Sequence, residues 1–302
     1  MSDQYFHFLA RGASRSRCDL LERLLARADD GVSVADWRAD AFRIIAPQAA
    51  SMPAVAAAAL CAAHGAVDAA WVCAATPVQY LAEMTSVRLP VDGMLSLSAA
   101  VADSLATDFN RVWRGSGVRM TATPSAQLFC AFDRALQVKT CDPQQALGMH
   151  IEEFLPSGPD SPRLRQLIGE TEMWLFEHVA NGARKKMGLP AVNGLWFWGG
   201  GAPLASLPDV QGRVAGDDLF FNAFGAAAIA TADCAVVAAG CVPGSEPWRD
   251  IETRWLRPAI DALRAGRLSR LLLSAEDRRF AVTARGLRRF WRAKRPWWES
   301  FA

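Results

Sequence analysis

Three consecutive glycines after a run of alternating bulky residues form the segment best suited to ligand binding. The segment reads VNGLWFWGGG and spans Val192–Gly201. We expect a strand over Leu195–Trp198 and a tight turn over Gly199, Gly200 and Gly201. Glycines let a ligand approach the backbone, and their exposed N–H groups can hold an anion. In α/β sheets ligands bind at the carboxyl ends of strands, where this turn would lie.

Two tryptophans add hydrogen-bond donors to the same segment. Trp196 and Trp198 share one face of the predicted strand, and a buried indole N–H needs an acceptor. The predicted binding site therefore runs from Asn193 through the two indoles to the glycines. The alternative is a tight connection packed under aromatic cover, because the spacing matches neither GxGxxG nor a P-loop.

A polar stripe on the preceding helix is the second group with chemical potential. His178, Asn181 and Lys185 fall at i, i+3 and i+7, with Arg184 beside them. The short connection from this helix to the strand predicts that the helix end and the glycine turn are neighbours. His178 is then a candidate acid/base and Arg184 a candidate phosphate clamp. Alternatively, His178 is a satisfied core histidine, and Arg184 with Lys185 forms a solvated helix face.

Candidate metal ligands are sparse. The chain has four histidines: His7, His64, His150 and His178. Asp217 and Asp218 come late in the chain without a histidine nearby, and the cluster His150, Glu152 and Glu153 is a weak match to a metal site. We therefore predict no metal and no cofactor.

The elements that must position these residues alternate between strands and helices, which favours an α/β fold with a layered mixed sheet and flanking helices. The proline-rich loop Pro156–Pro162 predicts a boundary between an α+β part (1–157) and an α/β part (158–302). The same loop also fits a surface connection within one continuous domain.

Several elements are expected from local patterns. Apolar residues keep a helical period from Leu164 to Val179, and Thr76-Pro77 is expected to break a β-rich stretch. Helices are also expected over Asp217–Ile229, over Ser245–Ala265 with a kink at Pro258, and from near Gly286.

Composition excludes several classes of protein. The chain has 302 residues, of which 51% are hydrophobic and 21% charged, so extended disorder is not expected. The net charge is only +2, so no overall positive electrostatic field that would attract nucleic acid is expected. No apolar run follows a basic segment at the start, and none of the seven cysteines forms a CxxC pair. These features predict a soluble, cytoplasmic protein.

The C-terminal segment from Arg278 to Trp298 contains eight basic residues and no acid, with aromatic residues between them. This mixture suits an anionic membrane surface, single-stranded nucleic acid or a protein partner. The alternative is a terminal helix that docks through Leu287, Phe290 and Trp291 while its arginines face water.

Four blocks in matching order resemble the RpfE-type regulatory protein family of proteobacteria. They are His178–Gly201, Trp71–Leu89, Trp255–Leu273 and Arg288–Arg292. Members are often labelled as cofactor-independent phosphoglycerate mutase-like. The pattern Asn-x-x-Trp-x-Trp-Gly-x-Gly, from Asn193 to Gly201, is similar to a segment of the archaeal-type mutases of the alkaline-phosphatase superfamily. The resemblance implies a fold distantly similar to part of the mutase fold.

The resemblance also implies what this chain lacks. Mutase chemistry uses two metals and a Ser or Thr nucleophile, held by several Asp and at least three His. No Asp-Gly-x-x-Asp motif stands near the N-terminus, and Gln79 stands where members often have His. We therefore predict a non-catalytic or weakly catalytic regulatory protein that binds a small anionic ligand, a peptide or a protein partner. The alternative is an enzyme, mutase-like or phosphatase-like, that acts on a phosphorylated small molecule.

Overall fold

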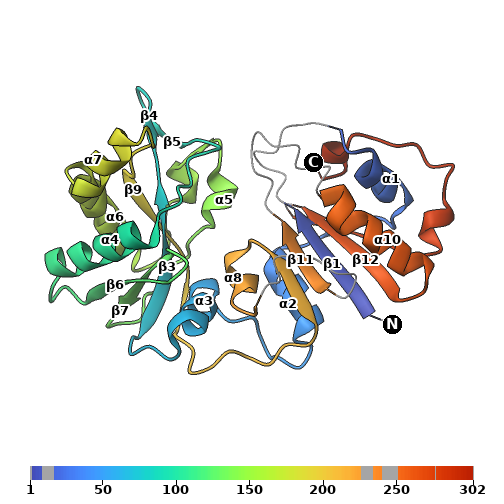
Figure 1. Cartoon of the computed structure of the whole chain (residues 1–302), viewed down its shortest axis with the longest axis horizontal. Helices are drawn as coiled ribbons and strands as arrows, with labels where there is room; N and C mark the ends of the chain where they lie inside the picture. Colours follow the sequence, from blue (N-terminus) through green and yellow to red (C-terminus); the bar gives the residue numbers. More distant parts are fainter. Residues whose placement is uncertain (1, 9–16, 226–233, 240–250, 276, 302) are drawn as a thin grey trace. The chain divides into compact units, whose positions relative to one another are not determined.

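The chain folds into two compact units, seen in the computed structural model of Figure 1. The terminal unit combines Met1–Met52 with Pro208–Ala302, and the inserted unit spans Pro53–Leu207. The loop Pro156–Pro162, where a boundary was expected, lies inside the inserted unit. The structure describes residues 2–8, 17–225, 234–239, 251–275 and 277–301.

The terminal unit contains a six-stranded mixed sheet of order β10-β11-β1-β12-β13-β2. Its first four strands are parallel, and the last two continue the sheet antiparallel. The strands are β1 (Ser2–Phe8), β2 (Val32–Ser33), β10 (Arg213–Gly216), β11 (Cys234–Ala239), β12 (Leu268–Ala275) and β13 (Arg278–Val282).

Helices cover both faces of this sheet. Phe6 of β1 joins the core formed with α1, η2, α10 and α11, whereas His7, on the opposite face, stacks on Trp37 of α2. The helical elements are α1 (Asp19–Arg27), α2 (Trp37–Ile45), α8 (Leu219–Asn222), η2 (Glu252–Leu256, π-helical), α10 (Arg257–Arg264), η3 (Gly286–Arg288) and α11 (Trp297–Phe301).

Three helices expected in the terminal unit differ from the prediction. The helix expected over Asp217–Ile229 is short, because α8 spans only Leu219–Asn222, and the stretch 226–229 lies outside the described residues. The start of the helix expected over Ser245–Ala265, residues 245–250, also lies outside the described residues. Directly before Pro258, where a kink was expected, the chain forms the π-helical turn η2, in which the Arg257 N–H bonds to the Glu252 carbonyl. The helix expected from Gly286 is wrong: one 3₁₀ turn forms there, and the next helix begins after Pro296.

The inserted unit is built on an antiparallel sheet of order β6-β7-β3-β9, with a small sheet of order β4-β5-β8. The strands are β3 (Trp71–Val78), β4 (Leu81–Ala82), β5 (Val87–Leu89), β6 (Val118–Ala122), β7 (Leu128–Phe132), β8 (Met149–His150) and β9 (Gly194–Gly201). The helices are α3 (Val55–His64), α4 (Ala99–Val112), α5 (Pro143–Ala146), η1 (Glu152–Phe154), α6 (Ser161–Phe176) and α7 (Val179–Lys186). The α/β prediction of layered sheets with flanking helices is confirmed.

The break expected at Thr76-Pro77 does not occur, because β3 continues through Pro77 to Val78. The pairing of β3 with β7 covers only Trp71–Ala74, whereas the pairing with β9 continues to the end of β3. Pro77 therefore lies beyond the ladder with β7, in which its missing N–H would have been required.

Candidate functional site

The three glycines of the predicted turn belong to strand β9. Trp198 pairs with Ala74 and Gly201 pairs with Val72, so β9 holds one more residue than β3 between these pairs. Gly199 has φ 63, the left-handed conformation that a β-bulge of this kind favours at a glycine. The predicted glycine turn is therefore wrong, because the segment is a bulged continuation of the strand.

The glycines make room for neighbouring side chains. A Cβ added at Gly200 would lie 2.0 Å from Cζ2 of Trp71, and one added at Gly201 would lie 2.5 Å from Cβ of Ala54. Ala54 caps helix α3, so the glycines allow both this helix and the Trp71 indole to approach β9 closely. Their absent side chains thus serve packing inside the unit.

The indole donors of β9 have acceptors within the protein. Trp196 Nε1 donates to the Cys141 carbonyl at 2.7 Å, and Trp198 Nε1 donates to Oγ1 of Thr76 at 2.8 Å. Both tryptophans are buried. Internal hydrogen bonds therefore satisfy the donors that were predicted to meet a ligand.

Asn193 holds the start of β9 to the chain that follows β3. Its Oδ1 accepts from the Tyr80 N–H at 2.7 Å, and its Nδ2 donates to the Tyr80 carbonyl at 2.9 Å. The side chain thereby replaces one residue pair of a strand ladder. Next to it, a Cβ at Gly194 would lie 2.2 Å from the Tyr80 ring. The absence of a side chain at Gly194 therefore leaves room for this ring.

His178 separates two helices where one helical period was expected. Helix α6 ends at Phe176, and His178 is the N-cap of α7, where its Nδ1 accepts from the Ala180 N–H at 3.2 Å. A backbone N–H can only donate, so in the neutral ring the proton lies on Nε2, 3.3 Å from Oδ2 of Asp108. The buried imidazole also meets the Trp174 ring edge-on. These contacts match the alternative of a core histidine, although Nε2 makes no hydrogen bond of good geometry to Asp108.

Asn181 ties the end of α6 to the entry of β9. Its Nδ2 donates to the carbonyls of Leu175 and Val192, both at 2.8 Å, and its Oδ1 accepts from the Val192 N–H at 2.9 Å. Both ends of the side-chain amide are therefore engaged by backbone groups.

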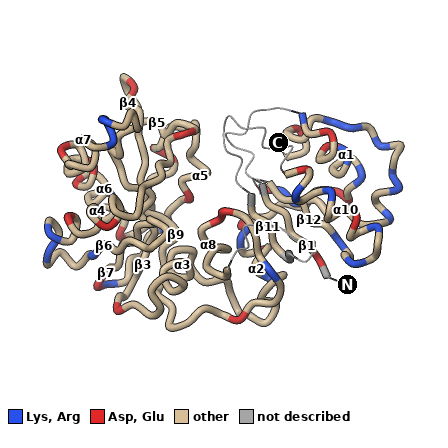
Figure 2. The backbone as a smooth tube through the Cα atoms, viewed as in Figure 1, with Lys and Arg blue, Asp and Glu red and all other residues tan. Residues whose placement is uncertain are grey.

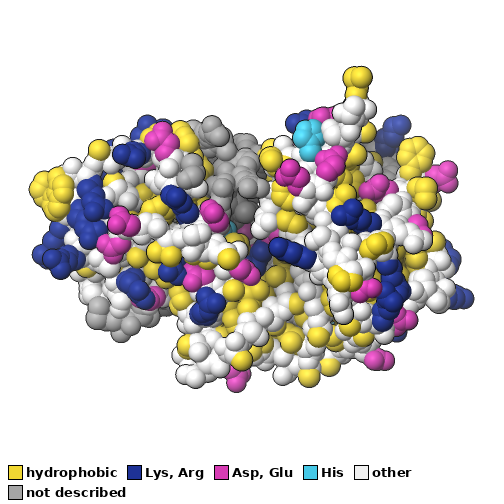
Figure 3. Space-filling model, turned by 180° about the vertical axis from the view of Figure 1, so that it is seen from behind, with side chains coloured by type: hydrophobic (Ala, Val, Ile, Leu, Met, Phe, Trp, Pro, Cys, Tyr) yellow, Lys and Arg dark blue, Asp and Glu magenta, His cyan; other side chains and the backbone are white. Residues whose placement is uncertain are grey.

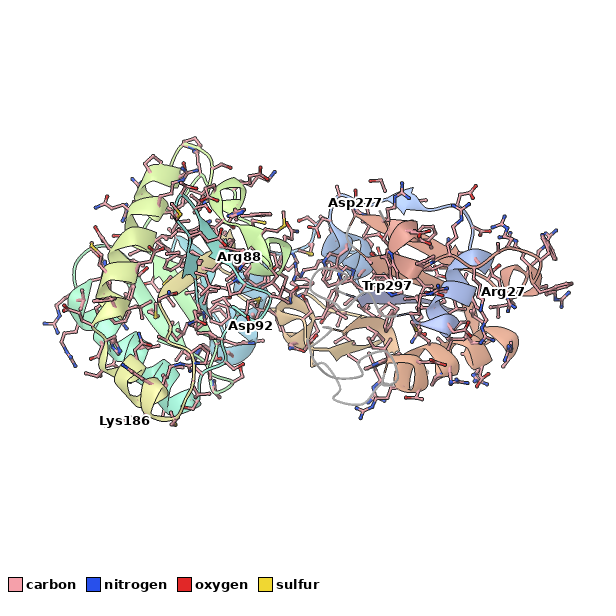
Figure 4. All side chains as sticks on the ribbon, turned by 90° about the horizontal axis from the view of Figure 1, so that it is seen from above. Arg27, Arg88, Asp92, Lys186, Asp277 and Trp297 are labelled. Carbon is pink, nitrogen blue, oxygen red and sulfur yellow. The ribbon has the colours of Figure 1, made fainter. Side chains whose placement is uncertain are left out.

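Arg184 is buried, which differs from the solvated helix face considered for it. Its Nε donates to the Pro190 carbonyl at 2.7 Å and its Nη1 to the Ser96 carbonyl at 3.2 Å. Burial lowers the pKa of the guanidinium. Lys185 is exposed, as expected, and Figure 4 shows Lys186 at the margin of the inserted unit.

The structure does not bring the two predicted groups into one site. Asn181 bonds to Val192, just before β9, whereas the glycines Gly199–Gly201 end that strand. At about 3.3 Å per residue, roughly 20 Å of strand separates them. Figure 1 likewise shows α7 and α3 toward opposite ends of β9.

Exposed apolar side chains mark a surface that the sequence did not predict. Met173 and Phe176 lie on α6 away from its buried stripe, and the three others lie at the ends of α7. We call this set the α6–α7 surface, with exposures between 46% and 83%: Met173, Phe176, Val179, Met187 and Leu189. Val179, which the expected helical period placed on the apolar face, is exposed where α6 has already ended.

A buried polar cluster in the terminal unit was also missed. His7 Nδ1 lies 3.3 Å from Oγ of Ser274, and its ring stacks on Trp37 at 3.6 Å. Next to it, Arg38 donates twice to Oδ2 of Asp218, at 2.9 and 2.7 Å. Burial, followed by the charge of Arg38, holds the pKa of His7 well below its ordinary value. The neutral imidazole and the serine hydroxyl thus join strands β1 and β12.

Within the described parts of the chain, no three His, Cys, Asp or Glu side chains converge on a point that could hold a metal ion. In the weak cluster considered at His150, the histidine and Glu152 have different partners. His150 Nδ1 lies 4.0 Å from Oε2 of Glu83, and Oε1 of Glu152 accepts from the Val87 N–H at 3.2 Å. In the same described parts, no helix combines the length and apolarity needed to cross a membrane.

Comparison with known proteins finds similarity to phosphoglycerate mutases. No family model matches the chain. A stretch of 66 residues, 22% of this chain, is 36% identical to a 2,3-bisphosphoglycerate-independent phosphoglycerate mutase of Methanothrix thermoacetophila. The match spans 17% of the length of that relative.

Two solved structures are also similar. A cofactor-independent phosphoglycerate mutase from Thermoplasma acidophilum has a TM-score of 0.38 and 10% identity, over 94% of this chain and 90% of its own. A protein from Pyrococcus horikoshii has a TM-score of 0.38 and 9% identity, over 91% of this chain and 81% of its own. The chain thus has a weak similarity to cofactor-independent phosphoglycerate mutases.

Proposed function

We propose that this chain is a non-catalytic regulatory protein of the RpfE type that binds a protein partner through the α6–α7 surface. One observation carries the proposal. The candidate site residues of α7 and β9 make internal hydrogen bonds, while apolar side chains of α6 and α7 face solvent. These site residues are His178, Asn181, Arg184, Trp196 and Trp198. The resemblance of four blocks to the RpfE-type family supports the regulatory role.

The arrangement suits a contact surface because its base is rigid. His178, Asn181 and Arg184 hold α7 against other segments of the inserted unit, so the backbone that carries the exposed side chains is ordered before binding. Methionine and phenylalanine are common in the centres of interfaces, where their burial supplies the binding free energy. Lys185 and Lys186 border this surface, so a partner with an apolar patch and acidic neighbours fits it.

A small anionic ligand at Asn193–Gly201 stays a prediction of the sequence. Such a ligand would compete with the internal acceptors of Trp196 and Trp198 and with Trp71, which packs on Gly200. This competition is why the proposal favours a protein partner.

Site-specific photocrosslinking in cells of the source organism tests the proposal. A benzoylphenylalanine placed at position 176 is expected to crosslink one defined protein, identified by mass spectrometry. The matched control carries the same group at Met84, which is fully exposed in the same unit. Equal crosslinking at both positions, or crosslinking only to another copy of this chain, contradicts the proposal.

The second candidate is an enzyme that acts on a phosphorylated small molecule. It is supported by the 66-residue match to a phosphoglycerate mutase. In this case His178 would exchange a proton and Arg184 would hold a phosphate, which requires both to leave their internal partners. Turnover of phosphoglycerate or release of phosphate in the presence of manganese would support this candidate.

A further inference from the structure

The C-terminal segment Arg278–Trp298 shows only part of the docking that was considered for it. A terminal helix was considered that docks through Leu287, Phe290 and Trp291 while its arginines face water. Instead, Phe290 is 79% and Trp291 is 70% exposed. Leu287 packs against the core and Trp297 is buried, so the stretch 287–297 is anchored at both ends and exposes Phe290 and Trp291 between them.

Two arginines of this segment turn toward the protein. Arg289 Nη1 donates to the Ala28 carbonyl at 3.1 Å and to Oδ1 of Asp29 at 2.7 Å, and Arg292 Nη1 donates to the Ala28 carbonyl at 2.9 Å. Ala28 is the C-cap of α1, where carbonyl groups lack helical partners and the helix dipole favours a cation. Lys294 pairs with Asp19 at the other end of α1. The cations thus fasten the segment along one helix, whose last residue, Arg27, lies at the margin of the unit in Figure 4.

Three other arginines lie within five residues of the exposed aromatic pair in the sequence. Arg285, Arg288 and Arg295 are exposed, and none of them forms an ion pair with another described residue. Figure 2 shows the basic residues as blue stretches of the chain near α1. In Figure 3, apolar side chains project at the margin of the terminal unit beside Lys and Arg side chains.

The geometry of the aromatic pair distinguishes between anionic partners. The rings of Phe290 and Trp291 lie 5.4 Å apart at 82°, edge to face. Two rings at this angle cannot both stack on neighbouring bases that are parallel to each other. A compact aromatic tip with free arginines close to it in the sequence matches the interface of a bilayer, where aromatic rings sit among headgroups and cations meet phosphates.

We propose that Phe290 and Trp291 insert into the headgroup region of an anionic lipid bilayer, with Arg285, Arg288 and Arg295 against the lipid phosphates. This association is peripheral and reversible, because two side chains and three charges give moderate binding. The proposal is independent of the α6–α7 surface and of the partner proposed for it.

Co-sedimentation of the full-length protein with vesicles tests the proposal. One set of vesicles contains equal parts of phosphatidylcholine and phosphatidylglycerol, and the other contains phosphatidylcholine alone. The wild-type protein is expected to sediment with the anionic vesicles only, and added salt should release it. The double variant Phe290→Ser/Trp291→Ser should lose binding by about tenfold or more. The triple variant Arg285→Gln/Arg288→Gln/Arg295→Gln should lose about fivefold per arginine.

A matched control removes another exposed aromatic side chain. Phe176→Ser changes a phenylalanine that is 83% exposed in the inserted unit, and it should bind vesicles like the wild type. Circular dichroism checks that each variant is folded. The proposal is overturned if the Phe290/Trp291 variant binds as well as the wild type. It is also overturned if the wild type ignores anionic vesicles but binds a single-stranded oligonucleotide or only a protein.

Discussion

The α6–α7 surface and the Phe290–Trp291 tip both expose large apolar side chains, but different polar groups support them. Under the α6–α7 surface, His178, Asn181 and Arg184 are held by groups of the inserted unit itself. At the tip, Arg289 and Arg292 anchor the segment, while three further arginines stay in solvent. The first surface thus offers apolar contacts on a rigid base, and the second offers apolar contacts within a positive field.

This difference shows that residue type alone does not assign a role to a polar side chain. The buried arginine Arg184 meets backbone carbonyls, and the exposed arginine Arg288 meets water, although both lie in basic stretches of sequence. The surrounding chain decides which of them supports structure and which is free to bind an anion. The following predictions test this division, from the largest expected effect to the smallest.

Asn181→Ala should lower the free energy of unfolding most, by about 3 kcal/mol, because it leaves the Val192 N–H and two carbonyls without their partner. Urea unfolding measures the change. Lys185→Ala, exposed on the same helix, is the control and should change it by less than about 0.5 kcal/mol. An equally small effect of both variants would show that the hydrogen bonds of Asn181 do not make the α6–α7 surface rigid.

Arg289→Ala/Arg292→Ala should lower the free energy of unfolding by about 2 kcal/mol, because α1 loses the donors at its carboxyl end. The variant should also weaken binding to anionic vesicles, since the tip is no longer fixed. Arg264→Ala/Arg267→Ala, exposed elsewhere in the terminal unit, should do neither. Weaker vesicle binding without any loss of stability would mean that these arginines contact lipid directly.

The terminal unit should lose stability in acid through His7. Its pKa in the folded protein lies well below the ordinary value, so below about pH 6.5 the unfolded chain binds a proton that the folded chain does not. Stability should therefore fall as the pH falls, by roughly 1 kcal/mol from about pH 7.5 to about pH 5.5. His7→Gln should flatten this slope in urea unfolding, whereas His64→Gln, exposed in the inserted unit, should leave it unchanged. The same slope in all three proteins would contradict a neutral His7.

Phe176→Ser and Phe290→Ser should change the free energy of unfolding least, by less than about 0.5 kcal/mol each. Their effects on binding should separate. The first should abolish crosslinking from a benzoylphenylalanine at position 179, and the second should weaken vesicle binding. If either variant lost both crosslinking and vesicle binding, the two surfaces would not act independently.

Local patterns predicted part of the fold, including the α/β class, the strand over Leu195–Trp198 and the helix that contains Leu164. They failed where distant residues decide the structure. The bulge at Gly199 depends on pairing with β3, and the continuation of β3 through Pro77 depends on where its ladder with β7 ends. Neither condition is visible in the local sequence.

The candidate site shows the same limit. The sequence identified the indole N–H groups of Trp196 and Trp198 as donors that need acceptors when buried, and both have them. It could not show that the partners are other parts of the same chain, such as the Cys141 carbonyl, because those lie far away in sequence. The inward turn of Arg289 was hidden for the same reason.

The measurement that tests the account most directly is turnover by the wild type and by His178→Asn. Asparagine is a good N-cap, so it keeps an acceptor for the Ala180 N–H while it removes the imidazole. Interconversion of phosphoglycerates and release of phosphate are measured with manganese, and unfolding confirms that the variant is folded. The account predicts no turnover above background for either protein. Turnover by the wild type that His178→Asn abolishes while the fold is intact would contradict it.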